Sequence, residues 1–268
     1  MVSRANQPIQ KGLLDLPWKT AQTLEAYPML FPGTHRHPGF IDLTCDAAFQ
    51  LRMAINSQNS YAENRHSRAS IMASAFGLEC AANAVMNSLS LPSHLSEDLD
   101  RLPLLSKFDL FLKIITPDTH AGLNRGDARV YKVAELVRIR NEFVHSKVTN
   151  IDVEMGEPTD VGRAFSLPME MIPKVWSGTQ IPKPSMFWSR IDAKSALSVT
   201  TDFLDYFFRL SALDSEKVKE ILFQRTYITL GESSVIVESL FDEFATELEW
   251  AVSQGFKLGF IDFGKAKS

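Results

Sequence analysis

Three side chains near the end of one predicted helix could act together chemically. The apolar periodicity predicts a helix over residues 127–147, with Arg140 near the middle of its apolar arc. Asn141 and His145 lie four residues apart, so they share one edge of that arc. Histidine titrates near neutrality and can transfer protons, and the planar guanidinium of arginine suits phosphate oxygens. The spacing therefore permits acid–base chemistry beside a bound phosphate, with Asn141 orienting either the imidazole or the phosphate.

A structural interpretation of the same side chains stays open. An arginine in an apolar face often pairs with a carboxylate elsewhere in the core. A histidine at the end of a helix often serves only as a cap, because positive charge suits that terminus. On physical grounds alone, Arg140 and His145 could therefore hold the fold rather than perform chemistry.

The helix resembles the last core helix of HEPN domains. In that family an Arg, a polar residue that is commonly Asn, three variable residues and a His follow a hydrophobic helical turn. This chain has Leu136-Val137-Arg138-Ile139-Arg140-Asn141-Glu142-Phe143-Val144-His145. The upstream order agrees: an Ala-rich helix with internal Glu79 and Asn83, a helix containing Lys107, and a loop with Arg125-Gly126-Asp127. The resemblance covers residues 42 to 148.

The resemblance implies a helical, up-and-down core that forms a homodimer, with two copies of the motif meeting at an interface cleft. Many HEPN proteins are metal-independent endoribonucleases, often toxins or antiviral effectors, and a toxin would imply an antitoxin partner. By this resemblance Arg140, Asn141 and His145 would be catalytic. Other members have lost catalysis and bind RNA, a nucleotide or a protein. A purely structural helical protein in a larger assembly is a third alternative.

The overall charge gives no support to general nucleic-acid binding. The net charge is −4, whereas proteins that hold nucleic acid rely on Lys and Arg to neutralise phosphates. One local candidate surface is the segment 125–147, which carries six basic and three acidic residues. Four of its residues are candidate RNA contacts: Arg125, Arg129, Arg138 and Lys147. The alternative is an ordinary solvated helix face.

The sequence offers no other strong candidate site. His35 and His37 flank Arg36 in a Pro- and Gly-containing stretch that we interpret as a loop, and two histidines are too few for a metal site. Cys45 and Cys80 lie in apolar helical patterns and are interpreted as buried thiols rather than a disulfide. We therefore expect no metal or cofactor. The absence of a signal-like or membrane-spanning stretch favours the cytoplasm.

The elements expected around the motif are mostly helices, which predicts an all-α fold. We expect an irregular, Pro-containing N-terminal arm over residues 1–40, a HEPN-like up-and-down bundle over 41–150, and a C-terminal part over 151–268. That part should begin with a Pro-rich connection, irregular or holding a small hairpin near 165–175, followed by helices packed on the core. The predicted helices span residues 42–59, 67–89, 104–115, 127–147, 192–213, 216–223 and 232–254.

Overall fold

The computed structural model is mainly helical, as the sequence predicts. It describes residues 33–116, 122–145, 148, 150–157, 159–160, 165–166, 169–230, 233–238 and 242–261. Most of the predicted N-terminal arm, residues 1–32, lies outside this part of the chain. Within it, residues 33–37 and 224–238 form one compact unit, and residues from 38 to 223 with 242–261 form another.

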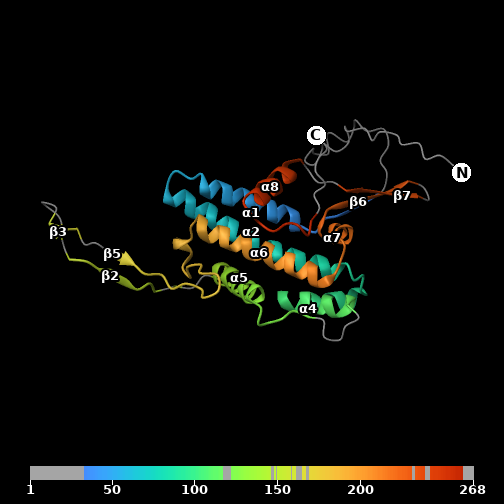
Figure 1. Ribbon diagram of the computed structural model, residues 1–268, viewed down its shortest axis with the longest axis horizontal. Helices are drawn as coiled ribbons and strands as arrows, with labels where there is room; N and C mark the ends of the chain where they lie inside the picture. Colours follow the sequence, from blue (N-terminus) through green and yellow to red (C-terminus); the bar gives the residue numbers. More distant parts are fainter. Residues whose placement is uncertain are drawn as a thin grey trace. The chain divides into compact units, whose positions relative to one another are not determined.

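The larger unit is built around helix α2 (Ser60–Asn87), which packs against α1 (Phe40–Ile55) and α6 (Arg190–Ser211), as Figure 1 shows. Small residues along α2 permit this close packing. The Ser70 hydroxyl donates to the Ala47 carbonyl oxygen at 2.8 Å, and the Thr200 hydroxyl donates to the Ser74 carbonyl oxygen at 3.1 Å. The Asn59 side chain caps α2, so this helix begins seven residues before the predicted position.

Helix α2 is also apolar enough to raise the question of a membrane. By length and composition it could cross one, with a mean hydropathy of 1.3 in its most apolar window. However, 72% of that window is buried inside the protein. This burial is typical of the core helix of a soluble protein, and no other described helix passes the same test.

The remaining helices of this unit complete the packing. Helix α4 (Leu104–Ile115) has the bounds predicted from the sequence, and Phe108 contacts the rings of Phe203 and Phe207 at centroid distances of 5.0 and 4.6 Å. Helices α3 (Ser93–Asp100) and α7 (Ser215–Leu222) are shorter. Helix α8 (Asp242–Ser253) packs on α1, where Arg52 pairs with Glu247.

Helix α5 (Ala128–Val144) carries the motif and packs against α6 and α2. Asp127 caps its first turn by accepting from the backbone N–H of Arg129 at 2.8 Å, as the sequence predicts. The helix ends at Val144, three residues before the predicted end. Its buried apolar residues are Val130, Val133, Leu136 and Ile139.

A three-stranded antiparallel sheet in the smaller unit was not predicted. Its order is β1 (Gly33–Arg36), β6 (Arg225–Leu230), β7 (Ser233–Glu238). The prediction of a helix beginning at residue 232 is therefore wrong, because residues 233–238 form a strand and the helix begins at Asp242. The run Val235-Ile236-Val237 is β-branched and favours a strand. The prediction of a loop at His35 and Arg36 is likewise wrong, because both pair with β6.

The Pro-rich connection contains short antiparallel strands, as the prediction of a small β element allowed, but they pair residues 153–160 with residues 165–171 rather than forming a hairpin within 165–175. Strand β2 (Val153–Met155) pairs with β5 (Met169–Met171), and β3 (Thr159–Asp160) pairs with β4 (Phe165–Ser166). After β5 the chain returns to α5. A single-turn 3-10 helix, η3 (Ser185–Phe187), then leads into α6.

Candidate functional site

A buried carboxylate on α5 binds the segment that follows the β2–β5 hairpin. Glu135 is 1% exposed, and its carboxylate accepts from the N–H of Thr179 at 2.8 Å and from the N–H of Gly178 at 3.0 and 3.1 Å. The Ser177 hydroxyl donates to the same carboxylate at 3.1 Å. Burial raises the pKa of Glu135, but the hydrogen bonds from backbone N–H groups and hydroxyl groups together lower it by more, so the pKa lies below its usual value. Glu135 is therefore an ionised anchor for this segment.

The turn at this anchor has room only for glycine. An added Cβ at Gly178 would lie 2.7 Å from Cε1 and 2.8 Å from Cδ1 of Tyr131, and 3.1 Å from the Glu135 carboxylate. The Tyr131 hydroxyl in turn lies 2.8 Å from the Ser177 hydroxyl. The turn therefore packs directly against the first half of α5.

The other end of the segment is bound to α2. The side-chain amide of Asn64 donates to the carbonyl oxygens of Ser185, Met186 and Trp188, at 2.9, 3.2 and 2.8 Å. The indole N–H of Trp188 donates to the Pro182 carbonyl oxygen at 2.7 Å, and its ring stacks on Phe143 with centroids 5.4 Å apart. Residues 177–188 are thus fixed to both α5 and α2.

A cavity of about 640 Å³ lies between this segment and the C-terminal turn of α5. Its volume is within the range of small-molecule binding sites. Four of the residues that line it carry ionisable or amide side chains: Asn141, Glu142, His145 and Lys183. The apolar part of the wall is formed by Ile139, Phe143, Ile151, Pro184, Met186 and Trp188. The cavity therefore combines polar groups with an aromatic wall.

His145 and Asn141 both belong to this cavity, as their shared helix edge predicts. His145 is the C-cap of α5, and its backbone N–H donates to the Asn141 carbonyl oxygen at 3.0 Å. Both side chains are exposed and, among the described residues, neither side chain makes a hydrogen bond. The Asn141 amide does not orient the imidazole here, so both groups remain available to a ligand.

Arg140 lies elsewhere. Its guanidinium pairs with Glu79 of α2, and it sits over the Phe76 ring at 5.7 Å from the centroid. Its side chain is 19% exposed, and burial lowers its pKa. Arg140 does not line the cavity that contains Asn141 and His145. Pairing with a carboxylate was the structural alternative that the sequence left open, although Glu79 is partly exposed rather than in the core, and the pairing separates Arg140 from the other two motif residues.

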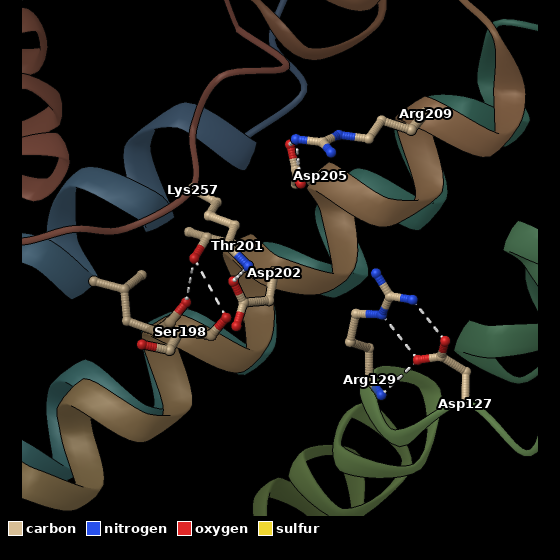
Figure 2. A network of polar contacts seen from close by, with 9 residues as sticks. Asp127, Arg129, Ser198, Thr201, Asp202, Asp205, Arg209 and Lys257 are labelled. Atoms are coloured by element: carbon tan, nitrogen blue, oxygen red, sulfur yellow. Dashed lines mark hydrogen bonds and ion pairs between the residues drawn. The ribbon is translucent and has the colours of Figure 1, made fainter.

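Two of the four candidate RNA contacts have intramolecular partners. Arg125 pairs with Asp109 of α4 at 2.8 Å. Arg129 pairs with Asp127 at 2.6 Å, and its guanidinium lies 3.9 Å from the centroid of the Tyr206 ring. Figure 2 shows Arg129 directed at Asp127, near α6.

The same view shows that neighbouring charges are also paired. Asp202 of α6 binds Lys257 at 2.9 Å, and Asp205 binds Arg209 at 3.0 Å (Figure 2). The Arg129 contacts hold Asp127 ionised, since its hydrogen bonds with Arg129 lower the pKa of Asp127 to about 2. Arg138 is exposed on α5, and Lys147 lies outside the described residues.

Several residues of the site could not be assigned from the sequence. Glu135 lies within an apolar stretch of α5, so a buried charge there was a detectable signal. Lys183 stands between Pro182 and Pro184, which fixes the backbone around it, but no local pattern links it to His145. Glu142 appears only as a variable position within the motif. Of these residues, Glu135 and Glu142 belong to α5, and Lys183 reaches the site through the fold of the segment after β5.

The two cysteines and the possible metal ligands can be located within the described residues. Cys45 and Cys80 are free, as expected, and burial raises the pKa of both thiols. Across the described ranges, no three His, Cys, Asp or Glu residues are grouped as metal ligands.

The cavity is therefore the strongest candidate site, and its assignment rests on its own residues. No protein-family model, no curated protein and no solved structure matches this chain.

Proposed function

We propose that the chain is a HEPN-type, metal-independent endoribonuclease whose reaction centre is the cavity at the end of α5. The observation that supports this proposal is that Asn141 and His145, two of the three motif residues, line one cavity with unoccupied side-chain hydrogen-bonding groups. The helical packing around α2 and the position of the motif on the last helix of this part of the chain agree with the resemblance.

The reaction needs two proton transfers. The ribose 2′-oxygen loses its proton and attacks phosphorus, the bond from phosphorus to the 5′-oxygen breaks, and the leaving 5′-oxygen gains a proton. The products are a 2′,3′-cyclic phosphate and a free 5′-hydroxyl. The imidazole of His145 can serve as base or acid. Glu142 lines the same cavity and can perform the other transfer, and in a homodimer the second copy would bring another His145.

A second candidate function is a catalytically silent module that binds RNA, a nucleotide or a protein partner. One observation favours it: Arg140, the permanent positive charge of the motif, is paired with Glu79 outside the cavity. A phosphorane-like transition state accumulates negative charge and gains from a cation nearby. If no other cation served, the cavity would bind without efficient catalysis.

The test is cleavage of mixed single-stranded RNA in the presence of a chelator. His145→Ala should lower the cleavage rate by about 10²–10⁴-fold, as expected when a general acid or base is removed, with an unchanged melting temperature. Arg138→Ala is the control, because Arg138 is exposed and does not line the cavity; it should alter RNA affinity at most. Equal residual activity in wild type and His145→Ala would identify the cleavage as contamination and remove this function.

The homodimer, a toxin or defence role, an antitoxin partner and a cytoplasmic location remain predictions from the resemblance and the sequence. Light scattering at low micromolar concentration tests the first of these. A strict monomer would exclude an arrangement in which two copies of His145 act on one phosphate, and would leave Glu142 as the second proton-transfer group.

A further inference from the structure

We propose that Lys183, not Arg140, is the residue that binds the phosphate of an unpaired nucleotide in this cavity. The inference rests on the proposed function for the identity of the ligand, and on the geometry of Lys183 for the role. It assigns a function to the Pro-rich segment, which contains no part of the motif.

The positive charges of Lys183 and Arg140 lie in different places. Lys183 lines the cavity together with Asn141 and His145, whereas Arg140 does not. The Arg140 guanidinium is paired with Glu79 and covers Phe76, so binding a phosphate would require it to leave a carboxylate. Among the described residues that line the cavity, Lys183 is the one lysine or arginine.

The Lys183 side chain is held in place without being neutralised. Its ammonium lies 4.8 Å from the centroid of the Trp176 ring, an attractive contact that leaves the full positive charge in place. In the described ranges no carboxylate lies within ion-pair distance of it, although Lys174 on the same segment pairs with Asp152 at 3.5 Å. An exposed ammonium with donors to spare is suited to an anionic ligand.

The backbone of Lys183 is fixed before any ligand binds. Its N–H donates to the Lys174 carbonyl oxygen at 2.8 Å, and the Trp176 N–H donates to the Ile181 carbonyl oxygen at 2.9 Å. The Glu135 anchor holds the tip of this turn to α5. Preorganisation of this kind lowers the entropic cost of binding.

The rest of the wall indicates the class of ligand. Phe143 and Trp188 line the same cavity as Lys183 and provide aromatic side chains, and the volume of about 640 Å³ suits a ligand of nucleotide size. A nucleobase can pack against these aromatic side chains only when it is not stacked within a double helix. The cavity should therefore take single-stranded rather than duplex nucleic acid.

The experiment measures binding separately from cleavage. The probe is a fluorescent single-stranded 2′-deoxyoligonucleotide, which lacks the attacking 2′-hydroxyl, and its affinity is measured by anisotropy over a series of salt concentrations. Lys183→Gln should weaken binding at least tenfold at low salt and reduce the slope of log K against log salt by about 0.7, the value for one phosphate contact on a single strand. Lys183→Arg should restore both.

Lys174→Gln is the matched control, because this lysine belongs to the same segment but does not line the cavity. It should leave affinity and salt slope unchanged. Arg140→Gln should lower the melting temperature but retain the affinity. No binding by wild type, an unchanged affinity in Lys183→Gln, or an equal loss in Lys174→Gln would each overturn the inference.

The same set of variants separates this inference from the proposed function. If Lys183→Gln loses binding but wild type cuts no RNA, the phosphate site stands and the ribonuclease proposal falls. If RNA is cut in a His145-dependent way with equal efficiency in wild type and Lys183→Gln, the ribonuclease stands and Lys183 is not its phosphate ligand.

Discussion

The carboxylate of Glu135 should control how firmly the cavity wall is attached to α5, and Glu135→Gln tests this. The substitution keeps the size of the side chain but removes its charge and replaces one acceptor oxygen with an NH₂ group. In the wild type, Oε1 accepts from Ser177 and Gly178, and Oε2 accepts from Gly178 and Thr179. In the variant one pair of donors would face another donor.

The size of the effect follows from these bonds. A hydrogen bond to a charged group contributes about 1.5–3 kcal/mol, and a buried donor left without a partner costs about 1–3 kcal/mol. Glutamine can keep the bonds at one oxygen, so we expect the turn at Ser177–Thr179 to lose about 2–4 kcal/mol of stability against opening. Since 1.36 kcal/mol corresponds to a factor of ten, opening should become roughly 30- to 900-fold more frequent.

The assay is amide hydrogen exchange at Gly178 and Thr179, whose N–H groups bind the carboxylate directly. Both amides should exchange faster in Glu135→Gln by the factor above if they exchange through local opening. Glu142→Gln is the matched control, because Glu142 lies on the same helix but its side chain is exposed and makes no hydrogen bond within the described residues.

Two results would exclude this role for the Glu135 carboxylate. Exchange at Gly178 and Thr179 that is unchanged in Glu135→Gln would show that the carboxylate does not hold the turn. Equal acceleration in Glu142→Gln would show that any loss of charge on α5 has the same effect, so the specific contacts would not matter.

Three further predictions concern the same anchor and the motif. The pKa of Glu135 is lowered in the folded state, so its contribution to the free energy of unfolding is present at neutral pH and should be lost as the pH falls below 4.5, the usual pKa of the group. The free energy of unfolding, measured as a function of pH in the acid range, should fall in this way in wild type and less so in Glu135→Gln. Gly178→Ala should cost about 1–3 kcal/mol in urea unfolding because of the contact with Tyr131, and adding Tyr131→Ala should recover part of it; no loss would contradict the close approach. A double-mutant cycle of Glu79→Gln and Arg140→Gln should give a coupling of about 1–2 kcal/mol in thermal unfolding, and zero coupling would argue against the pair.

The sequence was most informative where local signals and burial agree. Helix α4 has its predicted bounds because Pro103 precedes it and Pro117 limits its end, and α5 begins at the Asp127 cap. The start of α2 was missed because residues 60–66 are mostly polar, and apolar periodicity gives no signal for a largely exposed helical turn capped by Asn59. Pairing of β1 with β6 joins residues far apart in the chain, which no local pattern can reveal.

At the site, too, local spacing predicted some positions, whereas long-range packing determined others. The spacing of Asn141 and His145 was sufficient to place both on one edge of α5, and both line the cavity. The partner of Arg140 could not be identified, because Glu79 reaches it through the packing of α2 against α5. Lys183 was not found for a related reason: its position depends on hydrogen bonds from Ser177, Gly178 and Thr179 to Glu135.

The geometry of α5 explains why Arg140 is separated from Asn141 and His145. Adjacent residues on a helix differ by about 100° in direction, so Arg140 and Asn141 cannot point at the same place unless the arginine side chain reaches around the helix. In this structure the Arg140 side chain instead contacts α2, where Glu79 provides a carboxylate and Phe76 an aromatic ring. Under the proposal that the cavity binds phosphate, a cation other than Arg140 is needed, and the segment anchored by Glu135 and Asn64 brings Lys183 to the cavity. On this proposal the segment is part of the binding site. Loosening the Glu135 anchor should therefore weaken oligonucleotide binding, although Glu135 itself does not line the cavity.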